Sequence, residues 1–252
     1  MKLNAVLAGM ARLGTALAAS GAVLLALPAL AGDRALIDFI GFSADGRYFA
    51  FEEFGISDGA GFPYSSIYIV DLPNDRWLPG SPYRAEIEEE VSFEDYSADP
   101  AREQALAAAA PALARLAIRQ PAQVLAMIGD GVPDTDGQRL DFARVGYFPG
   151  ETADAYTLTM EMFPLDSSEP CEEYLGEKAK GFALTLSGTE AREVYRDASV
   201  PASRVCPLDY RIYAVVAPQF ASDLSSAVAI VSVFPLGFEG PNRRFIAVPL
   251  GK

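Results

Sequence analysis

The sequence predicts a mainly β protein of the α+β class, in which antiparallel sheets form a propeller-like or sandwich arrangement. An Ala-rich helical hairpin is expected to be inserted between the two β halves. Three observations predict this class: an Asp45-Gly46 turn between aromatic and β-branched runs, an Ala-rich stretch that begins at Asp99-Pro100, and dominant strand patterns from Leu140 onward. We divide the chain into a signal peptide (1–31) and one β-rich domain (32–252), which contains a blade-like unit (35–80), an acidic linker (81–99), a helical insert (100–129) and a C-terminal β half (138–250).

The first 31 residues have the pattern of a secretory signal. Lys2 and Arg12 supply positive charge, an Ala/Leu-rich apolar run follows, and Ala29-Leu30-Ala31 is a small-x-small cleavage site. The apolar run is too short for a membrane anchor. We therefore expect a periplasmic or secreted protein that starts at Gly32 and has no stable membrane insertion after cleavage.

Composition excludes several functions. The net charge is −14, and an acidic surface repels the phosphates of nucleic acids and of anionic membranes. The absence of histidine excludes His-based triads and nearly all zinc sites. Cys171 and Cys206 are the only cysteines, and in an oxidising compartment they are expected to form one disulfide.

The N-terminal unit is predicted to begin with a hairpin over residues 39–53. Asp45-Gly46 favours a primed two-residue turn, which needs positive φ at both central residues. Residues 67–72 read as a third strand after a Gly/Pro loop (57–65), and residues 75–78 read as a fourth.

The helical insert is predicted to start at Asp99, an N-cap residue followed by proline. Pro111 is expected to bend or split this helix. A second short helix is expected over residues 121–128, ending at Gly129. One face of the first helix has apolar residues at helical spacing, which indicate close packing against the β core: Leu106, Ala109, Leu113 and Leu116.

The segment 130–137 is the best metal candidate in the sequence. Its carboxylates are Asp130, Asp134 and Asp136, and its glycines permit a turn, as in loops that bind Ca²⁺ through alternating carboxylates. Val132 and Ala143 stand where an EF-hand would have its first and last ligands, so a plain turn remains the alternative.

The C-terminal half is predicted to contain paired strands. Residues 141–148 pair with 155–163, residues 181–186 pair with 193–196, and three further strands cover 210–217, 227–234 and 244–248. These last segments repeat the order of motifs at the start of the chain, which suggests two related sheet units.

If the two units are related, their corresponding loops emerge on the same side and form a recognition surface. The candidate binding residues in these loops are Asp58, Phe62 and Tyr64, with Phe238, Glu239, Arg243 and Arg244. Arginine binds carboxylate or phosphate groups through two parallel hydrogen bonds. The alternative is that Arg243 or Arg244 pairs with Asp58 or Glu239 and that the aromatic rings cover the core.

Several segments resemble a bacterial family of predicted secreted proteins, a domain of unknown function. The matching segments are 41–53, 58–64, 203–207 and 237–241. The resemblance implies no activity, cofactor or catalytic residue. The first 45 residues after the signal also resemble one blade of the TolB-type β-propeller.

The predicted function is a non-catalytic binding or interaction protein. Its partner would be a periplasmic protein or a small anionic ligand, and we assign no catalytic residue and no cofactor other than a candidate Ca²⁺. One alternative is a carboxylate-dependent hydrolase of envelope glycans, for which Glu52, Glu53 and Asp58 are the nearest candidates. Glu52 and Glu53 are neighbours on a strand and therefore cannot share one site. Another alternative is a calcium-stabilised structural protein.

Overall fold

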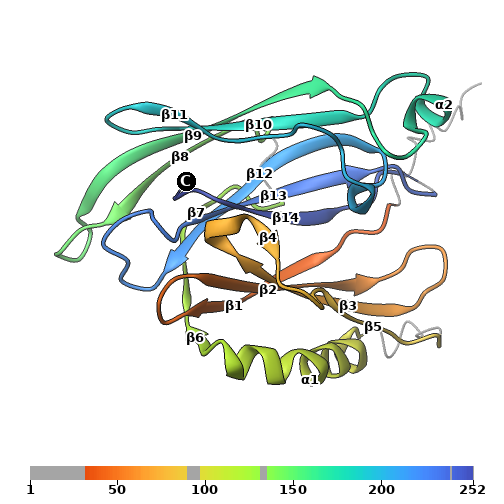
Figure 1. Ribbon diagram of the computed structural model, residues 1–252, viewed down its shortest axis with the longest axis horizontal. Coiled ribbons are helices and arrows are strands. Elements are labelled where there is room, and N and C mark those ends of the chain that lie inside the picture. Colours follow the sequence, from red (N-terminus) through yellow and green to blue (C-terminus); the bar gives the residue numbers. More distant parts are fainter. Residues whose placement is uncertain (1–31, 90–96, 131–134, 239, 252) are drawn as a thin grey trace, which may run out of the picture.

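The computed structural model describes residues 32–89, 97–130, 135–238 and 240–251. Within these residues four layers stack in the order helix, first sheet, central sheet and outer sheet (Figure 1). The predicted signal peptide lies outside the described residues. No described helix combines the length and the apolar character that crossing a bilayer requires.

The first sheet has the strand order β4-β3-β2-β1-β6, and β5 also pairs with β3. Its named strands pair antiparallel, so the predicted hairpin and the third and fourth strands are confirmed. The third strand starts earlier than expected, which places Tyr64 on a strand and not in a loop. The strands are β1 (Leu36–Ser43), β2 (Tyr48–Ile56), β3 (Pro63–Asp71), β4 (Arg76–Trp77), β5 (Tyr83–Glu86) and β6 (Ile118–Gln120); a 3₁₀ turn (Leu72–Asn74) precedes β4, and β5 lies in the predicted linker.

The β1–β2 turn differs from the predicted primed turn. Gly46 has φ of +67°, as expected, but Asp45 is not among the residues with positive φ. The Gly46 N–H donates to the Ser43 carbonyl at 2.9 Å, which closes a four-residue turn. The Asp45 carboxylate accepts bonds from the Ser43 hydroxyl (2.6 Å) and the Arg47 N–H (3.1 Å). These local bonds hold Asp45 in an ordinary conformation, so the prediction of two positive φ angles is wrong.

Helix α1 (Asp99–Arg115) covers the outer face of the first sheet. The predicted start is confirmed to within a residue, since the N-cap is Ala98. The predicted break at Pro111 is wrong, because the helix continues to Arg115 and Pro111 lies on its exposed side. The predicted face is partly wrong: Leu106 is 49% exposed. The buried face instead consists of Ala101, Ala105, Ala109, Ala112 and Leu113, and it lets the helix approach the sheet closely.

The predicted second helix is wrong, because its residues form strand β7 (Ala122–Met127). β6 pairs with β1 of the first sheet and β7 pairs with β12 of the central sheet, so the chain crosses between the two sheets at Pro121. A short apolar run does not distinguish a strand from a helix by periodicity alone. The pairing with β12 decides the conformation, and the insert is one helix and not a hairpin.

The central sheet has the order β14-β13-β12-β7 and is buried on both faces. In β13, Val228 and Ile230 pack toward the first sheet, while Ala229 and Val231 pack toward the outer sheet. A strand between two hydrophobic layers is apolar on both faces, which explains why Ser232 is the one polar residue of β13. The other strands are β12 (Pro207–Pro218) and β14 (Arg244–Pro249), and β13 spans Val228–Pro235.

The outer sheet has the order β11-β10-β9-β8, and both hairpins predicted for it are confirmed. A disulfide joins Cys171 to Cys206 with the Cα atoms 5.3 Å apart, as predicted. It ties the segment around α2 (Cys171–Leu175) to a 3₁₀ turn (Ala202–Arg204) that precedes the central sheet. The strands are β8 (Arg139–Val145), β9 (Thr152–Pro164), β10 (Lys180–Ser187) and β11 (Ala191–Arg196).

The stacked sheets form a β-rich sandwich-like fold, one of the two predicted forms. The first and central sheets also share a topology. In each, three consecutive strands form a meander (β1-β2-β3 and β12-β13-β14), and a fourth strand, β6 or β7, pairs with the first. Corresponding elements at the two ends of the chain therefore lie in two facing sheets.

Candidate functional site

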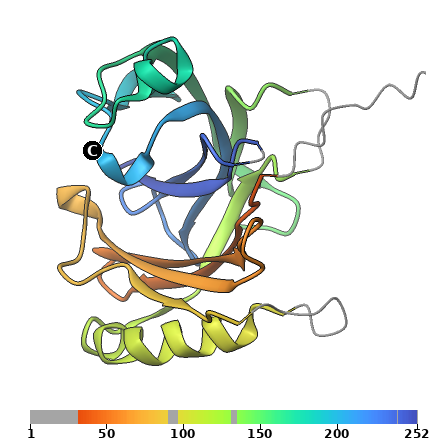
Figure 2. The ribbon, with the colours of Figure 1, turned by 90° about the vertical axis from the view of Figure 1, so that its right-hand side faces the viewer.

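A cavity of about 660 Å³ lies at one edge of the contact between the first and central sheets. One wall comes from the first sheet, another from the edge strand β14, and residues of the segment 201–205 line a third side. Figure 2 shows how the first and central sheets face each other. This volume is typical of small-molecule sites. The aromatic and arginine residues of the wall are Tyr64, Tyr68, Trp77, Tyr195 and Phe245, with Arg76, Arg84, Arg204 and Arg244.

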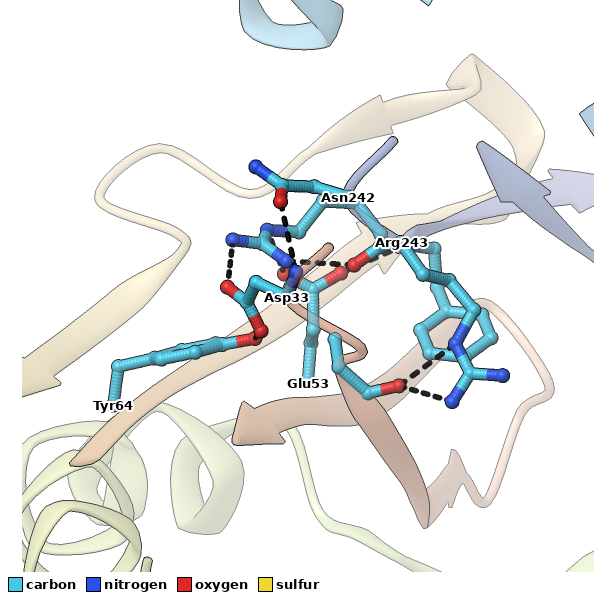
Figure 3. Close-up of polar contacts among 8 residues, drawn as sticks. Asp33, Glu53, Tyr64, Asn242 and Arg243 are labelled. Atoms are coloured by element: carbon cyan, nitrogen blue, oxygen red, sulfur yellow. Dashed lines mark hydrogen bonds and ion pairs between the residues drawn. The ribbon is translucent and has the colours of Figure 1, made fainter. Parts of the chain in front are cut away.

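Asp33, Glu53, Tyr64 and Arg244 form a polar cluster, here called the Asp33–Glu53 cluster, at the cavity wall (Figure 3). The Tyr64 hydroxyl donates to Asp33 Oδ1 at 2.9 Å, and Arg244 Nη2 donates to Asp33 Oδ2 at 2.6 Å. Arg244 Nε lies 3.5 Å from Glu53 Oε1, and its guanidinium carbon lies 5.1 Å from the centre of the Tyr64 ring. One guanidinium thus stands between two buried carboxylates.

Glu53 reaches the central sheet from β2. Alternation along this strand points Phe49, Phe51 and Glu53 toward the central sheet. The N–H of Phe245 on β14 donates to Glu53 Oε2 at 2.7 Å. Because β14 is an edge strand, this carboxylate satisfies a backbone group that has no neighbouring strand on that side.

Burial dominates the electrostatics of Glu53. It raises the pKa of the carboxyl to about 7, although Arg244 and the Phe245 N–H both act to lower it. Burial also raises the pKa of the Tyr64 and Tyr68 hydroxyls well above the ordinary value, so both remain protonated donors. The carboxyl of Glu53 therefore titrates near neutral pH.

Glu52 lies on the opposite face of β2, as the alternation predicts. It accepts from Arg102 of α1 at 2.8 Å and from the Ser65 hydroxyl at 2.8 Å, and the Arg102 guanidinium also stacks over the Phe54 ring. Glu52 therefore holds α1 to the first sheet and takes no part in the cavity.

Arg204 reaches the cavity from the disulfide-linked segment. Its Nη1 donates to both oxygens of Asp197, at 2.7 and 2.9 Å, and its Nη2 donates to the Tyr195 hydroxyl at 2.7 Å. This bidentate pair is largely buried, with 9% and 2% of the two side chains exposed. The disulfide, which ends at Cys206, therefore helps to fix a rigid side of the cavity.

Of the binding residues proposed from the sequence, Tyr64 and Arg244 come together at the cavity. Arg243 is turned away from it: its guanidinium donates to the Ala35 carbonyl at 2.6 and 2.9 Å and pairs with Asp130 (Figure 3). Both arginines pair inside the protein, with partners other than those expected from the sequence.

The other described candidates, Asp58, Phe62 and Phe238, do not line the cavity. Asp58 is exposed, Phe62 is half-buried in the β2–β3 turn, and Phe238 is 94% exposed. Glu239 lies outside the described residues.

The residues proposed for a metal site are only partly described. Asp130 pairs with Arg243, and Asp136 Oδ1 accepts the N–H of Gln138 at 2.9 Å, while Asp134 lies outside the described residues. The described part of the chain contains no group of three or more side chains of the kinds that hold a metal ion.

Comparison with known proteins identifies the family. Residues 50–251 match the family model described as "Predicted secreted protein (DUF2259)". The chain belongs to this family. It is accordingly a secreted protein, as its signal sequence predicts. No curated protein and no solved structure matches it significantly.

Sequence reasoning about this DUF2259 protein missed most of the cavity wall. The inward position of Glu53, in alternation with Phe49 and Phe51, was an available signal for a functional carboxylate. Asp33 offered no signal, because its partner Arg244 lies 211 positions away. Trp77 and Arg84 line the cavity because β4 and β5 pair with β3, and the sequence did not predict these pairings.

Proposed function

We propose that this secreted protein binds a small organic anion with a planar or apolar body in the cavity between the first and central sheets. The single observation that carries the proposal is the combination of rings and arginines around one cavity of suitable size in an otherwise acidic protein. Such sites combine apolar walls with a few convergent polar groups that orient the ligand.

The aromatic rings provide the surface for the body of the ligand. The Tyr68 and Trp77 rings meet edge-on with their centres 5.2 Å apart, and Trp77 remains 41% exposed. Rings fixed in this way present an apolar surface at little entropic cost.

Arg84 provides the cation. It is exposed on β5, lines the cavity and forms no ion pair within the described residues, whereas Arg204 and Arg244 are engaged by carboxylates of the protein. A guanidinium available to solvent at a cavity wall is suited to a carboxylate or phosphate group.

Hydrolysis remains the second candidate, and the pKa of Glu53, about 7, is the observation that favours it. A carboxyl that is protonated near neutrality has the property of a general acid. Two facts favour binding instead: Glu53 is 2% exposed, and the oxygens of Asp33 are engaged by Tyr64 and Arg244.

The sole tryptophan makes a direct test available, because Trp77 lines the cavity. We expect its fluorescence to change on titration with at least one of three probes: benzoate, galacturonate or inorganic phosphate. The Arg84→Gln variant should bind that probe about tenfold more weakly, as expected for the loss of one charge-assisted contact.

Arg119→Gln is the matched control, since Arg119 is exposed on β6 and does not line the cavity. The proposal would be refuted if none of the three probes changed the fluorescence of Trp77. Equal affinities of the Arg84 and Arg119 variants would also refute it.

A further inference from the structure

Three aromatic rings are exposed at the end of the molecule formed by the β8–β9 and β12–β13 turns. Tyr147 is 92% exposed, Phe148 is 65% exposed and Phe220 is 89% exposed. The two turns lie at the left of Figure 1. They are far apart in the sequence, yet they line one cavity of about 640 Å³. This cavity lies where the free edge of β7 in the central sheet meets the edge strand β8 of the outer sheet. Grouped exposed rings around a hollow mark a binding surface.

Backbone hydrogen bonds close the turn that carries two of these rings. In the β8–β9 turn, the Gly146 N–H donates to the Glu151 carbonyl at 2.7 Å and the Glu151 N–H donates to the Phe148 carbonyl at 3.0 Å. The Tyr147 and Phe148 rings pack edge to face with their centres 5.2 Å apart. The turn therefore places these two rings side by side without a ligand.

Phe220 carries a second, independent signal. Its φ is +63°, a conformation that costs free energy for a residue with a bulky side chain. The Phe220 ring is exposed to solvent, so burial of the ring does not offset the cost of this backbone conformation. Strained backbone conformations that present an exposed side chain are typical of binding sites.

Polar groups complete the cavity. Arg144 pairs with Asp154 at 2.5 Å, but its Nε is buried without a hydrogen-bond partner in the described part of the chain. Asp223 accepts the Ser225 N–H at 2.8 Å through Oδ1, and Gln123 of β7 lies at the same wall. The lining of the cavity thus combines a carboxylate, an amide and a guanidinium with three aromatic residues.

We propose that this cavity binds a neutral sugar ring of a glycan chain. The C–H groups on one face of a sugar ring are weakly positive and pack against the negative faces of aromatic rings. Its hydroxyl groups both donate and accept hydrogen bonds, so they match carboxylate, amide and guanidinium groups together. The ion pair of Arg144 with Asp154 leaves no excess positive charge, which favours a neutral sugar over an acidic one.

The site is distinct from the cavity of the proposed function, and the two share no lining residue. Anionic lipid is disfavoured as the occupant because the protein has a net charge of −14 and Asp154 and Asp223 lie at this surface. The remaining rival is a second copy of the chain.

The test uses isothermal titration of the secreted protein with three defined probes: chitohexaose, cellohexaose and maltohexaose. We expect at least one to bind and the Tyr147→Ala and Phe220→Ala variants to bind it about tenfold more weakly, as expected for the loss of a stacking ring. Phe238→Ala is the matched control, since Phe238 is equally exposed but lies outside this cavity.

The fluorescence of Trp77 should not respond to the sugar, because Trp77 lines the other cavity. This separates the result from the test of the proposed function. Failure of all three sugars to bind would overturn the inference, and so would unchanged affinity in both variants. A wild-type dimer that Phe220→Ala converts to a monomer in sedimentation, without sugar binding, would assign the surface to self-association and overturn it as well.

Discussion

Replacement of Glu53 by glutamine should change how the stability of the protein depends on pH. Glutamine has the shape of the protonated carboxyl, and its amide oxygen can still accept the Phe245 N–H. The variant therefore keeps the hydrogen bond across the two sheets, while it removes the titrating group together with its ion pair to Arg244.

The magnitude follows from the pKa of Glu53. Burial raises it from 4.5 to about 7 in the folded protein. An acid with a raised folded pKa binds more protons in the folded state, so the wild type loses stability as the pH rises from 4.5 through 7. A difference of this size corresponds to roughly 3 kcal/mol in the free energy of unfolding, of which roughly 2–3 kcal/mol falls between pH 5 and 8.

The assay is urea denaturation of the wild type and Glu53→Gln at pH 5 and at pH 8. The variant should gain stability relative to the wild type between these two values by the amount given above. Glu89→Gln removes one exposed carboxylate and controls for the general effect of net charge. An equal pH dependence of the wild type and Glu53→Gln would refute the reasoning.

Two further predictions concern elements that the sequence identified. Gly46→Val should lower the free energy of unfolding by about 1 kcal/mol or more, because Gly46 has φ of +67°; Gly59→Ala, in open space, should leave the melting temperature nearly unchanged. Loss of the disulfide in a Cys171→Ser, Cys206→Ser double variant should cost roughly 3–4 kcal/mol in urea denaturation, since the bond joins residues 35 positions apart. A double variant as stable as the wild type would show that the bond does not constrain the unfolded chain.

Local patterns predicted the strands well. The alternation in β9 and the turn residues between β8 and β9 were sufficient to place that hairpin, because a half-buried strand repeats every two residues. The same rule failed for residues 121–128, where an apolar run without a clear period took its conformation from pairing with β12. The conformation of such a segment depends on the strand it pairs with, which can be distant in the sequence.

The candidate site was predictable only in part. The matched order of motifs at the two ends of the chain predicted that the segments 58–65 and 237–244 would emerge on the same side. In the structure Tyr64 and Arg244, one from each segment, are in contact. Local sequence carried no information about Asp33 or about the pKa of Glu53, since both depend on burial between two sheets. Burial of a polar group is a property of the tertiary fold.

The contact between Asp33 and Arg244 bears on the timing of export. A secreted chain crosses the membrane from its N-terminus, so Asp33 arrives early and Arg244 arrives among the last residues. A contact that closes so long a loop forms late, because the loop entropy must be overcome first. The cavity wall is therefore assembled only after translocation is nearly complete, and a chain stalled in the membrane lacks the proposed ligand site. If the proposed function holds, binding of the ligand would show that the whole protein has been delivered.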